Sequence, residues 1–138
     1  MSYTRLRYHI VTGTKNREMI ITPALEEIIY PALQNKAMDN GGKLLRVGGV
    51  EDHVHVVAAI PPAIAVADFV REIKTGSSRA VNKSGLLDRP FHWQLGYGAF
   101  TLNPFDLTEI LQYVANQKKH HAERTLWPAY EKFTEHDA

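Results

Sequence analysis

Two short segments, far apart in the chain, carry side chains that could do chemistry together. Residues 52–57 read Asp-His-Val-His-Val-Val, with two imidazoles separated by one residue. Residues 113–117 read Tyr-Val-Ala-Asn-Gln, with a phenol and a carboxamide four residues apart. Imidazoles and an amide oxygen can bind a divalent cation, and an activated phenol can act as a nucleophile. The two segments therefore contain the groups that are needed to break a phosphodiester bond and to hold one end covalently.

The first segment has the pattern of a β-strand that carries two candidate metal ligands. Alternate residues of a strand lie on one face, so His53 and His55 are predicted to project together, while Val54, Val56 and Ala58 pack the other way. A strand that is buried on its far side holds the two imidazoles rigidly. The same spacing also fits two partly exposed strand histidines that bind no ligand. The His-x-His motif by itself does not decide between these two interpretations.

The second segment has the pattern of a helix with one face toward a solvent-filled cleft. Tyr113 and Gln117 are four residues apart and share one helical face, which His120 continues. The same residues also fit a boundary tyrosine with its hydroxyl in solvent and an exposed glutamine. His120 could belong either to the polar row of a site or to a cation-rich helix end. We interpret His121 as part of a cation-rich helix end. An apolar stripe runs beside this polar row and comprises Leu107, Ile110, Leu111 and Val114.

The chemistry favours a single site made from both segments. A phenol with a pKa of about 10 is a poor nucleophile at neutral pH, and a nearby divalent cation can stabilise the phenolate and polarise a phosphoryl oxygen. His53, His55 and Gln117 would form a neutral, partly open ligand set with room for phosphate oxygens and water. Mg²⁺ prefers oxygen ligands and Mn²⁺ tolerates imidazole, so we expect either cofactor, with Zn²⁺ as an inhibitory or adventitious occupant.

The order of the predicted elements is strand, helix, strand, strand, helix, strand, helix. Thr22 is a candidate N-cap before Pro23, and Asn40-Gly41-Gly42 ends the first helix. The first six elements match a split β-α-β plan, which predicts an α+β, ferredoxin-like antiparallel sheet with helices on one face. The additional C-terminal helix must dock on its own domain or on a second subunit. We predict strands over 3–14, 43–50, 53–60 and 91–102, and helices over 23–40, 63–82 and 103–124.

Composition is that of a soluble domain. The chain has 138 residues, of which 44% are hydrophobic, and we expect residues 1–138 to form one domain. It contains no cysteine, which excludes a disulfide framework and a thiolate metal site. No apolar run is long enough to span a membrane and the N-terminus lacks a signal-peptide core, so we expect a cytoplasmic protein with no membrane partner. The net charge of +1 does not by itself indicate nucleic acid.

Four segments, in order along nearly the whole chain, resemble the HUH endonucleases, which are named for a His-hydrophobic-His motif. More narrowly, they resemble the single-tyrosine transposases of the two-hundred-type insertion sequences and their repeat-associated relatives. The His-x-His motif alone is weak, whereas the ordered set is specific. The matching segments are residues 8–17, 49–57, 93–100 and 113–121.

This resemblance implies a reaction and a role for each motif residue. Tyr113 would attack a phosphate in single-stranded DNA, retain the 5′ end as a phosphotyrosine and release a 3′ hydroxyl, and a second 3′ hydroxyl could rejoin the strands without ATP. His53, His55 and Gln117 would hold the metal ion, with Asn116 and His120 as accessory residues.

The resemblance also implies two partners. Family members are homodimers in which the tyrosine helix of one subunit completes the metal site of the other, and they recognise imperfect hairpins at element ends. Whether the helix of this chain docks in cis or is exchanged is left open by the sequence. Basic residues would contact DNA phosphates, and our candidates are Arg5, Arg7, Arg71, Lys74 and Arg79.

Two other functions stay open at this point. The chain could be a domesticated relative that processes palindromic repeats of the host, which only genomic context separates from a mobile-element enzyme. It could instead be a non-catalytic nucleic-acid-binding module, because ferredoxin-like sheets often carry stacking aromatics. Such a module would bind hairpins without regard to metal, and His53→Ala would leave that binding unchanged.

Overall fold

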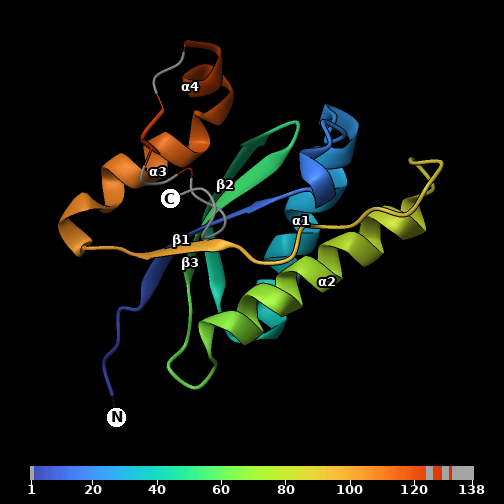
Figure 1. The fold of residues 1–138 in the computed structure, drawn as a ribbon. Helices are drawn as coiled ribbons and strands as arrows, with labels where there is room; N and C mark the ends of the chain where they lie inside the picture. Colours follow the sequence, from blue (N-terminus) through green and yellow to red (C-terminus); the bar gives the residue numbers. More distant parts are fainter. Residues whose placement is uncertain (1, 124–125, 129–130, 132–138) are drawn as a thin grey trace.

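The computed structural model describes residues 2–123, 126–128 and 131 (Figure 1). At its centre is a four-stranded sheet with the strand order β2-β3-β1-β4, in which every neighbouring pair is antiparallel. This is the ferredoxin-like, α+β arrangement that the element order predicts. The strands are β1 (Arg7–Gly13), β2 (Lys43–Val50), β3 (His53–Ala59) and β4 (Gly98–Thr101).

Two helices, α1 (Pro23–Asp39) and α2 (Val66–Ser84), cover one face of the sheet (Figure 1). Because side chains alternate along a strand, β3 sends Val54, Val56 and Ala58 into the core under these helices, and each is at most 3% exposed. The predicted start of α1 is confirmed, since the Thr22 hydroxyl accepts a hydrogen bond from the backbone N–H of Leu25 at 3.3 Å.

The opposite face carries the C-terminal helices α3 (Leu107–Ala115) and α4 (Gln117–Glu123) of the same chain (Figure 1). A second, smaller apolar cluster is formed there by Val57 of β3 with Ile110 and Val114 of α3. Gly48 of β2 lies against α3 so closely that a Cβ atom at this position would be 1.9 Å from the Val114 carbonyl oxygen. The sheet is therefore enclosed between two helical layers, and glycine permits the close approach of the second.

Two predicted strands are shorter in the structure. The first begins at Arg7 rather than at residue 3, and the fourth comprises only Gly98–Thr101 rather than residues 91–102. The segment before β4 meets the end of β1 at an isolated bridge between Thr14 and Trp93, and side chains of α2 hold the rest of it. The Lys74 ammonium donates to the carbonyl oxygens of Gln94 (2.7 Å) and Gly96 (2.9 Å), so the backbone oxygens there have partners outside the sheet.

The C-terminal helix predicted over residues 103–124 is interrupted. It consists of a 3₁₀ turn, η2 (Pro104–Asp106), followed by α3 and α4, which are separated at Asn116. The side-chain amide of Gln117 donates to the carbonyl of Tyr113 at 3.0 Å, the acceptor that a backbone N–H uses in a continuous helix. Within the described part of the chain, no helix is long and apolar enough to cross a bilayer.

Candidate active site

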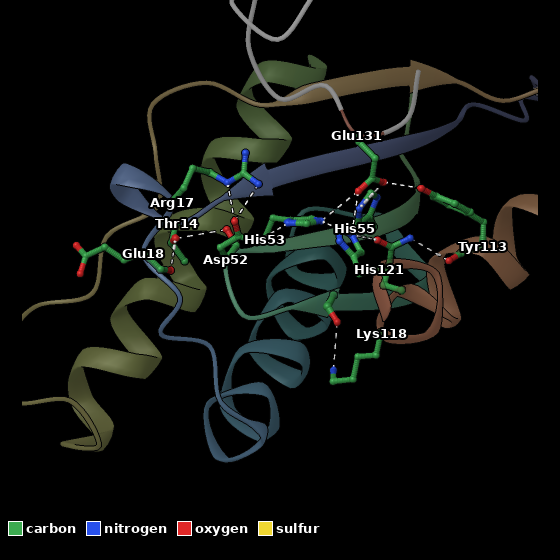
Figure 2. Close-up of polar contacts among 12 residues, drawn as sticks. Thr14, Arg17, Glu18, Asp52, His53, His55, Tyr113, Lys118, His121 and Glu131 are labelled. Carbon is green, nitrogen blue, oxygen red and sulfur yellow. Dashed lines mark hydrogen bonds and ion pairs between the residues drawn. The ribbon is translucent and has the colours of Figure 1, made fainter. Parts of the chain in front are cut away.

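His53 and His55 of β3 lie on the sheet face that α3 and α4 cover, as the strand period predicts. Both are buried, at 1% and 0% exposure, and their ring centroids are 5.1 Å apart. His121 of α4 and Glu131 of the C-terminal segment meet them there (Figure 2). One nitrogen or oxygen atom of each of these four residues lies within 4.8 Å of all the others. We refer to His53, His55, His121 and Glu131 as the imidazole cluster.

The Glu131 carboxylate joins the three rings of the cluster. Its Oε1 lies 3.0 Å from Nε2 of His121 and 3.3 Å from Nε2 of His53, and its Oε2 lies 3.1 Å from Nε2 of His55. Burial opposes ionisation of the carboxyl, but its hydrogen bonds to His53 and His55 prevail and hold the pKa of Glu131 well below its usual range. Glu131 is therefore a carboxylate at neutral pH.

Tyr113 of α3 meets the cluster at the same carboxylate. Its hydroxyl donates to Oε2 of Glu131 at 2.7 Å (Figure 2). The same hydroxyl accepts from the backbone N–H of Trp127 at 3.1 Å. The Trp127 ring stacks on the Tyr113 ring with centroids 4.5 Å apart, and Tyr113 is only 1% exposed. Burial and the hydrogen bond to Glu131 raise the pKa of Tyr113 well above its usual range, so the phenol is neutral in this arrangement.

Gln117 lies beside the cluster and contacts it through His121. The glutamine is 1% exposed, and its Oε1 is 3.2 Å from Nε2 of His121. The structure thus brings together Tyr113, Gln117 and the two strand histidines that the sequence singles out. Within this chain, α3 packs on its own sheet and brings the Tyr113 hydroxyl to the imidazole cluster.

The two predicted accessory residues lie outside the cluster. The His120 ring packs against Tyr113 with centroids 4.7 Å apart, and Asn116 is exposed where α3 ends. His121, which we interpret from the sequence as part of a helix end, is the histidine that joins the cluster. The signal that would have found it is its spacing of four from Gln117, which places the two on one face of α4.

The Nδ1 atom of each strand histidine, on the ring edge away from the cluster, has a different hydrogen-bond partner. His53 Nδ1 lies 2.7 Å from Oδ1 of Asp52, and the Arg17 guanidinium pairs with the other carboxylate oxygen at 2.9 Å (Figure 2). Burial lowers the pKa of His53, but hydrogen bonds to Asp52 and Glu131 outweigh it, so that the pKa is raised. His55 Nδ1 instead lies 2.8 Å from Nε2 of His9 on β1.

The buried pair of His9 and His55 is neutral at physiological pH. Burial is the largest cause in both residues and lowers the pKa of His55 to about 4 and that of His9 to about 3. A neutral imidazole is the form that binds a metal ion, because its lone pair is then available. His55 is thus in the protonation state that a ligand requires.

The donor set fits a divalent cation. Three imidazole nitrogens and a carboxylate converge, with the amide oxygen of Gln117 next to one of them. Mixed nitrogen and oxygen ligands of this kind suit Mn²⁺ and related ions, whereas an all-oxygen set is preferred by Mg²⁺. The cluster therefore could hold a metal ion, and its chemistry alone does not identify that ion.

The basic residues that we considered for phosphate contact lie in two other places. Arg5 and Arg7 line a cavity of about 270 Å³ beside the start of β1, and Arg71 and Lys74 line one of about 380 Å³ between α2 and residues 92–97. Arg71 pairs with Asp68 at 3.0 Å, Lys74 holds the segment before β4, and Arg79 is exposed on α2. Their role in DNA binding stays a prediction.

Comparison with known proteins identifies the family. Residues 2–117 match the family model described as "Transposase IS200 like". The ISDra2 transposase TnpA of Deinococcus radiodurans is 25% identical over 118 residues, which cover 82% of this chain and 84% of that protein.

Two solved structures share the fold. A crystal structure described as a transposase from D. radiodurans R1 superposes with a TM-score of 0.68 at 26% identity, covering 84% of this chain and 93% of that one. A REP-associated tyrosine transposase bound to a REP hairpin gives a TM-score of 0.64 at 15% identity, covering 92% and 73%. The matching family model spans most of the chain, which therefore belongs to the IS200-like transposase family.

Proposed function

We propose that this protein is a metal-dependent transposase that cleaves and rejoins single-stranded DNA through a 5′-phosphotyrosine intermediate. The observation that carries the proposal is the meeting of the Tyr113 hydroxyl and the imidazole cluster at one carboxylate, that of Glu131. A nucleophile beside a set of metal ligands is the minimum that this reaction needs. Membership of the transposase family supports a role in processing DNA.

The proposed reaction has two steps, cleavage and rejoining, and each step forms one bond to phosphorus and breaks another. The Tyr113 oxygen attacks the phosphorus atom, the phenolic hydrogen leaves as a proton, and the bond from phosphorus to the 3′ oxygen breaks. The 3′ oxygen takes up a proton and departs as a hydroxyl. A second 3′ hydroxyl then attacks the phosphotyrosine, rejoins the DNA and returns the phenol, so the energy of the ester is retained throughout.

The residues of the cluster would hold the metal ion. His53, His55 and His121 present Nε2 atoms to one another, and Gln117 and Glu131 lie beside them as oxygen ligands. A divalent cation bound there, Mg²⁺ or Mn²⁺, would polarise the phosphate and stabilise the developing charge on the phenol oxygen.

The C-terminal segment must move before DNA can react. Tyr113 is buried, with its hydroxyl bonded to Glu131 and its ring under Trp127, so a phosphate cannot reach the phenol while these contacts persist. We propose that binding of single-stranded DNA displaces Trp127 and Glu131 from Tyr113. The expected substrate is a strand that carries a hairpin, as in the REP-associated relative that was solved with one.

Replacement of Tyr113 by phenylalanine tests the nucleophile. A pool of labelled single-stranded oligonucleotides with randomised hairpins and flanks is incubated with protein and Mn²⁺ or Mg²⁺, and covalent complexes are counted on a denaturing gel. We expect wild-type protein to form the complex and Tyr113→Phe to form none while it still retains oligonucleotides on a filter. Tyr3→Phe, which alters an exposed tyrosine that has no assigned role in the site or in DNA binding, is the control and should react normally.

The same assay separates the alternatives. A covalent complex that persists undiminished in Tyr113→Phe would remove the assigned nucleophile. A wild-type protein that binds hairpins equally with and without metal, and never becomes attached, would instead be the non-catalytic module. The recovered hairpin sequence can then be located in the host genome, where a position at the ends of an element indicates a mobile-element enzyme and scattered palindromes indicate a domesticated relative.

A further inference from the structure

His9 lies directly behind one of the proposed metal ligands. Its Nε2 is 2.8 Å from Nδ1 of His55, and the two rings stack with centroids 5.0 Å apart and an interplanar angle of 16°. His9 and His55 are both fully buried, on the neighbouring central strands β1 and β3. Phe100 of β4 packs against the other side of the His9 ring at 5.8 Å, so the ring is held between two strands.

The partner of His53 differs in one chemical respect. Asp52 is a carboxylate and only accepts hydrogen bonds, so it keeps a hydrogen on Nδ1 of His53. Nε2 of His53 faces the cluster, 3.3 Å from Oε1 of Glu131, and could offer its lone pair to a cation there. A neutral imidazole can donate or accept through the same nitrogen. His9 can therefore match either arrangement of hydrogens on His55, which a carboxylate could not do.

Two neutral arrangements are available to the pair. If His9 Nε2 donates, then His55 carries its hydrogen on Nε2, which faces Oε2 of Glu131 at 3.1 Å. If His55 Nδ1 donates instead, then His9 accepts and Nε2 of His55 presents a lone pair to the cluster. The first arrangement suits a carboxylate neighbour, and only the second suits a cation.

We infer that His9 is a positioning residue for the cation site, because its Nε2 accepts the Nδ1 hydrogen of His55 and so leaves the Nε2 lone pair of His55 to the metal ion. The inference rests on the proposed function, since it requires a cation at the cluster. It adds a group that acts through His55 and does not touch DNA or the phenol. It also gives a reason for a buried histidine at this point of β1.

Nuclear magnetic resonance of the wild-type protein tests the position of the hydrogen. The imidazole nitrogens are labelled with ¹⁵N, and spectra are recorded without metal and with Zn²⁺ as a diamagnetic probe. With Zn²⁺ we expect the hydrogen between the two rings to be bonded to Nδ1 of His55 and coupled to Nε2 of His9. A hydrogen bonded to Nε2 of His9 in the Zn²⁺ form would overturn the inference without any variant.

Variants test the energetic consequence by titration with Mn²⁺ in a calorimeter. His9→Leu removes the acceptor and should weaken Mn²⁺ binding about 10- to 100-fold, the usual range for loss of such a partner. His9→Gln places an amide oxygen near the same point and should restore binding to within about threefold of wild type. Val11→Ala trims a buried residue that pairs with His55 in the sheet without touching a ring nitrogen, and it should bind as wild type does.

The outcomes distinguish this inference from the function on which it rests. If wild-type protein binds Mn²⁺ and His9→Leu binds it equally well, the role of His9 is wrong while the proposed function stands. If wild-type protein binds no metal and forms no covalent complex, both are wrong. Weaker binding in His9→Leu with recovery in His9→Gln supports the positioning role, since a purely structural loss would not be restored by an acceptor.

Discussion

Glu131 determines the state of the Tyr113 side chain in this structure. The carboxylate accepts the phenolic hydrogen and lies among three imidazoles, so one side chain links the proposed nucleophile to the proposed metal ligands. A carboxylate that accepts from a phenol favours the neutral phenol, and its charge disfavours the phenolate. The reactivity of Tyr113 thus depends on a residue from the end of the chain.

Substitution of Glu131 by alanine should lower the pKa of Tyr113. The hydrogen bond and the negative charge that raise this pKa are both removed, while burial continues to oppose ionisation. The measurement is an ultraviolet titration of metal-free protein, in which the Tyr113 signal is obtained by subtracting the curve of the Glu131→Ala, Tyr113→Phe double variant. An unchanged or higher pKa would show that Glu131 does not control the phenol.

Some residues of the candidate site could be predicted from a local sequence pattern, and others could not. His53, His55, Tyr113 and Gln117 could be predicted, because alternation in a strand and a spacing of four in a helix place them on defined faces. Glu131 could not, since no helix or strand period in the sequence places it and it reaches the cluster through tertiary structure alone. His9 sits on a strand whose period was clear, but its contact with His55 depends on the register of β1 against β3.

At the scale of elements, the contact between α3 and β2 decides where the nucleophile lies. Val114 is adjacent to Tyr113 in the chain, and its carbonyl oxygen lies directly over Gly48. The apolar stripe of the last helix and the ferredoxin-like order of elements were readable from sequence. The break at Asn116 was not, because it depends on a side-chain bond from Gln117 to the carbonyl of Tyr113.

Substitution of Gly48 by alanine should displace α3 and the tyrosine with it. The new Cβ would lie 1.9 Å from a backbone oxygen, which a rotamer change cannot relieve. We expect a loss of about 1–3 kcal/mol in the free energy of unfolding and a fall of at least tenfold in covalent complex.

A second glycine provides the control for that experiment. The nearest atoms that a Cβ at Gly76 of α2 would meet belong to the Lys36 side chain, at 2.9 Å and beyond, so Gly76→Ala should cost much less stability than Gly48→Ala. The measurements are denaturant unfolding and the gel assay. Full activity and stability in Gly48→Ala would mean that α3 does not need this close approach.

At the scale of the whole molecule, the sheet carries two different faces. The face under α1 and α2 is an ordinary apolar core, whereas the opposite face holds four histidines, at positions 9, 53, 55 and 121, and two carboxylates, at positions 52 and 131. Two of these histidines are buried in neutral form. The stability of the entire fold is thereby coupled to pH through the site.

Acid should destabilise the metal-free protein well before its carboxylates titrate. The folded-state pKa values of His9 and His55, about 3 and about 4, lie below the unfolded value of 6.5, so the unfolded chain binds more protons between these limits. Stability must then fall as the pH falls through this window, by up to about 2 kcal/mol for each residue between about pH 7.5 and pH 5. His53, whose pKa is raised, opposes part of this fall.

Urea unfolding in the presence of a chelator at several pH values measures this effect. Wild-type protein should lose stability from neutral pH to pH 5, and His9→Leu should lose less. His92→Gln, which replaces an exposed histidine outside the cluster, should keep the wild-type dependence. If stability were the same at both ends of the window in wild-type protein, the two histidines would not be buried as neutral groups.

The site gathers residues from position 9 to position 131, and its central contact joins strands 46 residues apart. Such distant groups meet only when nearly all of the chain has been synthesised and folded, because Tyr113 and Glu131 follow the strands that carry the other residues. In a nascent or truncated polypeptide, the histidines and the Tyr113 side chain would not be assembled into one cluster. The proposed DNA cleavage would therefore become possible only once residues as far as Glu131 are present, and shorter products of interrupted translation would lack it.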